Sequence, residues 1–168
     1  MKSKQTKYKG YNFRSRTEAR WAVFFDAMDI KYWYEHEDVN LKYHGRYLPD
    51  FYLPDFSGGC YVEVKGVADD HSIAKCKELA LQNKTQVLFL VGPPDFRTYT
   101  VFHFDEESGS VLENEVLIKA DQSRDSNSFF WEPGYQNEDG SIPVEYHENL
   151  CMGVAAIQKS RTKRFEFL

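Results

Sequence analysis

Apolar residues recur at helical spacing in the first part of the chain. Trp21, Phe25 and Met28 follow one another at intervals of three and four over about residues 16–29, which is the period of a helix with one buried face. Ahead of them, Ser15-Arg16-Thr17-Glu18 matches the Ser-x-x-Glu capping box that begins many helices. The pattern therefore predicts an amphipathic helix whose apolar face needs a sheet to cover.

A second helical pattern lies near the middle of the chain. Apolar residues again recur at spacings of three and four between about residues 70 and 83. Polar residues bound this stretch, so Asp70 or His71 is expected near its N-cap and Asn83 near its C-cap.

Alternating and aromatic-rich runs predict strands. Such runs are rich in the β-branched and aromatic residues that favour strands, and turn residues bound them. His44-Gly45 is a predicted tight turn between two runs, and Glu107-Ser108-Gly109 is the predicted turn of a later hairpin. Residues 31–35 are an aromatic-rich run, and the predicted strands cover residues 39–43, 46–53, 60–65, 86–91, 98–104 and 110–118.

The order of these elements indicates the fold class. Up to residue 92 the chain reads as a helix, three strands, a helix and a strand, which predicts an α/β core with a mixed central sheet. The three middle strands can meander antiparallel, and the last can return parallel beside them. The hairpin that follows extends this sheet.

Charge is distributed unevenly along the chain. The formal net charge is −5, yet residues 105–150 hold twelve acidic residues against two basic ones, a net charge of −10. Basic residues crowd the first twenty residues and residues 159–164 instead. We therefore predict a core over residues 1–118, which includes the extra hairpin, and an acidic C-terminal appendage over residues 119–168 that ends in a basic helix. The basic ends suit a nucleic-acid backbone, with a solvated surface as the alternative, and the acidic 105–150 region is a candidate contact for a protein partner.

Composition bounds the class of protein. A hydrophobic share of 42% and an aromatic share of 16% are the values of a globular chain with a real core. The three cysteines include no Cys-x-x-Cys pair, which argues against a disulfide framework and a structural zinc site. The longest apolar run has six residues, 87–92, too short for a membrane span. We expect a protein without membrane segments, in the cytoplasm of a bacterium or a phage-infected cell.

One predicted strand carries an acid and a cation side by side. In Tyr61-Val62-Glu63-Val64-Lys65 the period of two turns Glu63 and Lys65 to one face and the two valines to the other. A rigid element therefore presents a carboxylate next to an ammonium group.

A second carboxylate is expected to meet the first. Asp50 follows Pro49, which has no N–H to give to a sheet and so favours a strand edge or a bulge. If the strands on either side of the Pro54–Gly59 turn pair, Asp50 and Glu63 converge. Two carboxylates with open positions beside them suit Mg²⁺, with Mn²⁺ as a substitute. Such an ion can activate water for attack on a phosphate, and Lys65 can orient that water.

The same residues carry a family resemblance. Pro49-Asp50 followed by Glu63-Val64-Lys65 resembles the P-D…(D/E)-x-K signature of the PD-(D/E)XK, or restriction-endonuclease-like, nucleases. The predicted order is similar to their αβββαβ core. The resemblance spans residues 8 to about 92, and it is nearest to phage junction-resolving endonucleases and the endonuclease subunits of heteromeric transposons.

The resemblance implies a Mg²⁺-dependent DNA endonuclease with a defined site. It implies Glu18, Asp50, Glu63 and Lys65 as catalytic residues, and a metal held by Asp50, Glu63, Glu18 and the Val64 backbone carbonyl. The capping box already explains Glu18 without catalysis, so both roles stay open for it.

The positions of the basic residues indicate candidate contacts with DNA. The basic residues on the two helices are candidate DNA contacts, with a solvated helix surface as the alternative. A different class remains open, a nuclease-like fold that binds DNA or assembles with a partner without catalysis. The substrate's structure is not indicated. The candidate DNA-binding residues are Arg14, Arg16, Arg20, Lys75 and Lys77.

Overall fold

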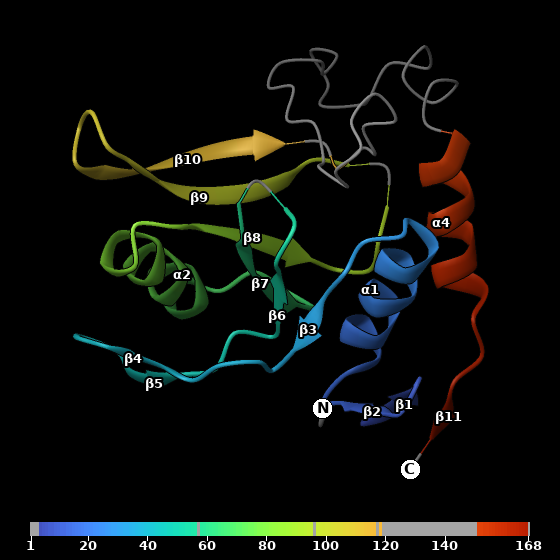
Figure 1. The fold of residues 1–168 in the computed structure, drawn as a ribbon. Helices are drawn as coiled ribbons and strands as arrows, with labels where there is room; N and C mark the ends of the chain where they lie inside the picture. Colours follow the sequence, from blue (N-terminus) through green and yellow to red (C-terminus); the bar gives the residue numbers. More distant parts are fainter. Residues whose placement is uncertain (1–3, 57, 96, 117, 119–150, 168) are drawn as a thin grey trace.

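A mixed central sheet organises the molecule, which a computed structural model describes for residues 4–56, 58–95, 97–116, 118 and 151–167 (Figure 1). Within these residues the main sheet has six strands in the order β10-β9-β8-β7-β6-β3. The sheet strands are β3 (Trp33–Tyr34), β6 (Phe51–Leu53), β7 (Cys60–Lys65), β8 (Gln86–Val91), β9 (Tyr99–Asp105) and β10 (Ser110–Val116).

Strand directions match the predicted mixed topology. β3, β6 and β7 pair antiparallel, β7 and β8 pair parallel, and β8, β9 and β10 again pair antiparallel. The parallel pair needs a crossover, which α2 (Asp70–Gln82) supplies. The α/β class, the mixed sheet and the added hairpin are thus confirmed.

Helices cover both faces of the sheet, each over its own apolar core. α1 (Arg16–Ala27) and α4 (Cys151–Thr162) lie on one face, where Trp21 and Phe25 are almost fully buried (Figure 1). α2 lies on the other face, where Leu79 packs against Phe89 of β8 in a second cluster. Burying one such side chain stabilises the fold by about 1.5–3 kcal/mol.

Both predicted helix starts are close to the observed ones. Ser15 is the N-cap of α1, and its hydroxyl accepts a hydrogen bond from the Glu18 amide at 3.1 Å, as the capping box predicts. α2 begins at Asp70, as expected, but its N-cap is Asp69, one residue before the expected Asp70 or His71, because the Asp69 side chain accepts from the Ser72 amide. Asn83 is its C-cap, as expected.

The predicted strand over residues 46–53 is divided in two. β4 (Val39–Leu41) and β5 (Gly45–Tyr47) form a separate two-stranded sheet, and the chain then crosses to β6 in the main sheet. The break falls at residues 48–50, where Pro49 has no N–H for a continuous ladder. Tyr47 consequently packs in the α2 cluster and Phe51 in the α1 cluster.

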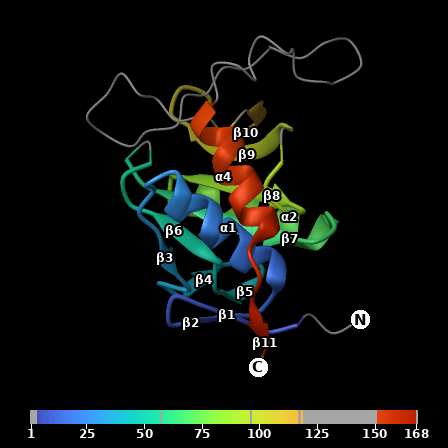
Figure 2. The ribbon, with the colours of Figure 1, turned by 90° about the vertical axis from the view of Figure 1, so that its right-hand side faces the viewer.

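Residues 151–167 join the core, which differs from the appendage expected there. α4 packs along α1, and its Ala156 and Ile157 belong to the main apolar cluster (Figure 2). A small sheet then unites the two ends of the described chain, because β11 (Glu166–Phe167) pairs with β1 (Thr6–Tyr8), which in turn pairs with β2 (Tyr11–Phe13). Residues 119–150, with most of the acidic region, lie outside the described residues.

The length and polarity of the helices can be compared with the expectation of no membrane segments. In the described ranges, each helix is too short or too polar to cross a lipid bilayer.

Candidate active site

The register between two strands places the expected carboxylates opposite one another. β6 and β7 pair with Phe51 against Val62, so the next residues outward, Asp50 and Glu63, face each other across the ladder. Phe51 and Val62 point into the α1 core, and alternation turns Asp50 and Glu63 to the opposite face. The predicted convergence of these two carboxylates is therefore present in the fold.

Asp50 is a buried carboxylate with two partners. It is 4% exposed. Its Oδ2 accepts from the Val64 amide at 2.7 Å, and its Oδ1 accepts from Arg14 Nη2 at 3.0 Å. Burial raises the pKa of Asp50 well above its ordinary value, and the negative charges of Glu63 and Glu18 raise it further. The Val64 amide and the Arg14 charge act in the opposite direction and only partly offset this rise.

Glu63 is held at both oxygens. It is 3% exposed, Lys65 Nζ lies 2.9 Å from its Oε1, and the Tyr47 hydroxyl donates to its Oε2 at 2.6 Å. Burial lowers the pKa of Lys65, but the ion pair with Glu63 outweighs burial and raises that pKa overall. Lys65 is consequently a fixed cation beside Glu63, as period-two alternation predicts.

Glu18 enters the same region from the start of α1. Its Oε1 accepts from the Ser15 hydroxyl at 2.8 Å, and its Oε2 accepts from the Tyr34 hydroxyl at 2.7 Å and the Arg14 amide at 3.2 Å. Glu18 is 6% exposed, and its charge contributes to the raised pKa of Asp50. It thus holds the residues just before α1 through the Ser15 hydroxyl and the Arg14 amide, and it also lies within electrostatic reach of Asp50.

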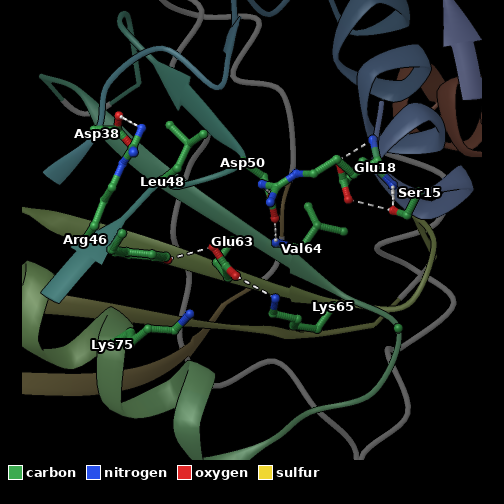
Figure 3. Close-up of a pocket in the computed structure, with 13 residues that line it drawn as sticks. Ser15, Glu18, Asp38, Arg46, Leu48, Asp50, Glu63, Val64, Lys65 and Lys75 are labelled. Atoms are coloured by element: carbon green, nitrogen blue, oxygen red, sulfur yellow. Dashed lines mark hydrogen bonds and ion pairs between the residues drawn. The ribbon is translucent and has the colours of Figure 1, made fainter. Parts of the chain in front are cut away.

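These side chains line one open cavity of about 580 Å³. Figure 3 shows Asp50, Glu63 and Lys65 between the start of α1, which carries Glu18, and Lys75 of α2. The cavity is polar on the side of the carboxylates and is walled by β5 opposite α1. Its lining includes Arg14, Ser15, Glu18, Asp38, Arg46, Tyr47, Leu48, Asp50, Glu63, Val64, Lys65, Gly66 and Lys75.

The candidate DNA-binding residues fall into those that line the cavity and those that lie elsewhere. Arg14 and Lys75 line the cavity. Arg16 is exposed on α1, and Lys77 pairs with Glu113 at 3.2 Å. Arg20 donates to the carbonyls of Ser160 and Arg161 at the end of α4, so its guanidinium has a structural role in the helix packing.

Two functional side chains were not identified from the sequence. The Tyr34 and Tyr47 hydroxyls fix Glu18 and Glu63, respectively. Both residues read only as strand aromatics in the sequence. Tyr47 stands three residues before Asp50, which is the one signal that could have suggested a place near the site.

The donor set can be tested against a divalent cation. Asp50 and Glu63 are buried carboxylates whose charges repel, and Mg²⁺ is commonly held by one or two carboxylates together with water. Among the described residues no three His, Cys, Asp or Glu side chains are grouped closely enough to hold a metal ion together. Two buried carboxylates with room for water agree with that donor set, and metal binding by Asp50 and Glu63, like ligation by Glu18 or by the Val64 carbonyl, stays a prediction.

Comparison with known proteins adds no relative: no family model matches the chain, and a search of curated proteins finds no match.

Proposed function

We propose that this protein is a Mg²⁺-dependent DNA endonuclease with a restriction-endonuclease-like core. The observation that carries the proposal is the buried pair of Asp50 and Glu63 on facing strands, with Lys65 paired to Glu63 at 2.9 Å. The order α1, β3, β6, β7, α2, β8 supports it, because this is the αβββαβ order of that nuclease class. β4 and β5 form an insertion in it.

Asp50 and Glu63 would hold the cation, and Lys65 would act on the reacting water. Bound there, Mg²⁺ would lower the pKa of water and offset charge on the scissile phosphate. Lys65 keeps its proton, since Glu63 raises its pKa, and it can donate a hydrogen bond to the attacking oxygen or to the phosphate. The Tyr47 hydroxyl holds Glu63 in one orientation.

The cavity wall suits a phosphodiester backbone. Arg14 has a side chain that is 53% exposed, and Lys75 of α2 lines the same cavity. Two cations in one cavity can contact phosphates and position the strand over the carboxylates. Arg16 and Lys77 would add weaker, peripheral contacts.

The direct test is cleavage with and without metal. The full chain is incubated with linear, circular, single-stranded and four-way-junction DNA in Mg²⁺ and in EDTA. Cleavage in Mg²⁺ alone, lost in Asp50→Asn and kept in Asp38→Asn, supports the proposal. Asp38 is a matched control because it lines the cavity but pairs with Arg46 at the rim. Cleavage by Asp50→Asn at the wild-type rate would overturn it.

A second candidate is a DNA-binding or assembly module without catalysis. Two observations favour it: each of the three carboxylates already has protein hydrogen-bond donors, and the described residues contain no three-ligand cluster. Under this alternative the chain binds the same DNA panel but cuts none of it in Mg²⁺ or Mn²⁺.

A further inference from the structure

A protein cation occupies the oxygen of Asp50 that faces the cavity. Oδ2 is turned to the backbone and accepts from the Val64 amide, which leaves Oδ1 for Arg14 Nη2 at 3.0 Å. Among the residues that the structure describes, Arg14 is the cation in contact with this carboxylate. Lys65 has the corresponding place on Glu63.

Arg14 has other partners that would hold it if its guanidinium left Asp50. Its Nε pairs with Glu35 Oε1 at 2.5 Å, and its backbone amide donates to Glu18 Oε2 and the Tyr34 hydroxyl. The side chains of Glu35 and Arg14 are 29% and 53% exposed, whereas the Asp50 side chain is buried. The guanidinium therefore has a second, more exposed carboxylate as a partner.

A divalent cation bound at Oδ1 of Asp50 would lie beside the Arg14 guanidinium, and the two positive charges would repel, so the two compete for this carboxylate. We propose that Arg14 is the counter-ion of Asp50 in the metal-free protein and competes with the divalent cation for this carboxylate. Once the cation displaces it, the Arg14 guanidinium stays paired with Glu35 and rotates to contact a DNA phosphate. This inference rests on the proposed function. It assigns Arg14 as a positioning residue that makes metal binding and DNA binding cooperative.

Calorimetric titration of Mn²⁺ into the DNA-free full chain at pH 8 tests the competition. Arg14→Gln should bind Mn²⁺ about tenfold more tightly than wild type, because an adjacent positive charge is removed from the ligand. Arg14→Lys should stay within about twofold of wild type, since it keeps the charge. Arg46→Gln is the matched control: it removes the same charge from the same cavity, but from a residue that pairs with Asp38.

The sign of the result separates competition from damage, because a misfolded site would bind metal more weakly. The gain from Arg14→Gln should also vanish in an Asp50→Asn background. Wild-type affinity in Arg14→Gln, or weaker binding, overturns the inference and leaves the proposed function intact. A chain that binds no Mn²⁺ in any variant overturns both.

DNA binding supplies an independent readout in a Lys65→Ala background. In Ca²⁺, Arg14→Gln should flatten the log–log salt slope on duplex DNA by about one unit, the loss of one phosphate contact. In EDTA the slope should be unchanged, because Arg14 is then held by Asp50. An equal change in both conditions would show that Arg14 contacts DNA without regard to the metal, and would overturn the coupling.

Discussion

The candidate site has two halves that are built differently. Asp50, Glu63 and Lys65 lie on adjacent strands of the main sheet, and their mutual positions follow from one register and one alternation. Glu18 lies at the start of α1, and its place depends on how that helix packs on the sheet. The strand half is set by backbone geometry and the helix half by side-chain packing.

Electrostatics separates the halves further. Burial and neighbouring charges raise the pKa of Asp50 in the strand half. Glu18 instead accepts hydrogen bonds from three neutral donors, the Ser15 and Tyr34 hydroxyls and the Arg14 amide. The strand carboxylates are therefore paired with protein cations, Asp50 with Arg14 and Glu63 with Lys65, whereas Glu18 is held by neutral donors.

The largest effect is expected from neutralising the strand half. Asp50→Asn and Glu63→Gln should each lower the cleavage rate by about a thousandfold or more, because the cation loses a ligand of which it has few. Each variant should fold, since Asn and Gln keep an acceptor for the Val64 amide and the Tyr47 hydroxyl. Initial rates on plasmid DNA and calorimetric Mn²⁺ binding measure this, and more than a tenth of wild-type activity would be inconsistent with it.

Neutralising Glu18 in the helix half should lower activity less than neutralising a carboxylate of the strand half. Glu18→Gln keeps an oxygen for Tyr34 and the Arg14 amide, so the free energy of unfolding should change by about 1 kcal/mol or less. If the charge of Glu18 assists the reaction, activity should fall by about a hundredfold in a folded protein. Urea titration and initial rates separate the two roles. A folded, fully active variant would leave Glu18 with capping alone.

The two tyrosines allow the halves to be compared by matched changes. Tyr47→Phe frees Glu63 and should weaken Mn²⁺ binding by about tenfold. Tyr34→Phe frees Glu18 and should leave Mn²⁺ binding within about twofold, if the strand half alone holds the ion. Both remove one hydroxyl that donates to a carboxylate, at 2.6 and 2.7 Å. Equal losses in the two variants would place Glu18 among the metal ligands.

The smallest effect is a pH dependence of stability. The pKa of Asp50 is raised in the folded state, so as pH rises through the unfolded value the unfolded chain loses its proton first. Stability contributed by this group is therefore lost between the unfolded pKa, about 3.9, and the higher folded pKa. Relative to wild type, the free energy of unfolding of Asp50→Asn should increase by about 1 kcal/mol or more between pH 4 and pH 8. Denaturant titrations at the two pH values measure it, and a constant difference would contradict it.

The restriction-endonuclease-like core, the metal and the DNA substrate follow from this sequence only as a resemblance and its implications. The amino-acid sequence alone predicts how residues a few positions apart in the chain are placed relative to one another. Glu63 and Lys65 share a face because strand residues two apart always do, and Ser15 caps α1 because a Ser-x-x-Glu pattern places a hydroxyl near the third amide. These relations need only the local backbone conformation. They were sufficient to place Glu63 and Lys65 side by side, and the convergence with Asp50 also required the pairing of β6 with β7.

Tertiary structure decided the rest. The chain leaves one sheet for another at Pro49, Arg14 reaches Asp50 across 36 residues, and Arg20 reaches Ser160 across 140. Each depends on which surfaces pack together, and hydrophobic burial is not directional, so patterns show which residues are buried but not what they contact. The partners of Glu18, Asp50 and Glu63, and with them the competition proposed for Arg14, emerge only when the helix, the hairpin β4–β5 and the main sheet have closed around one cavity.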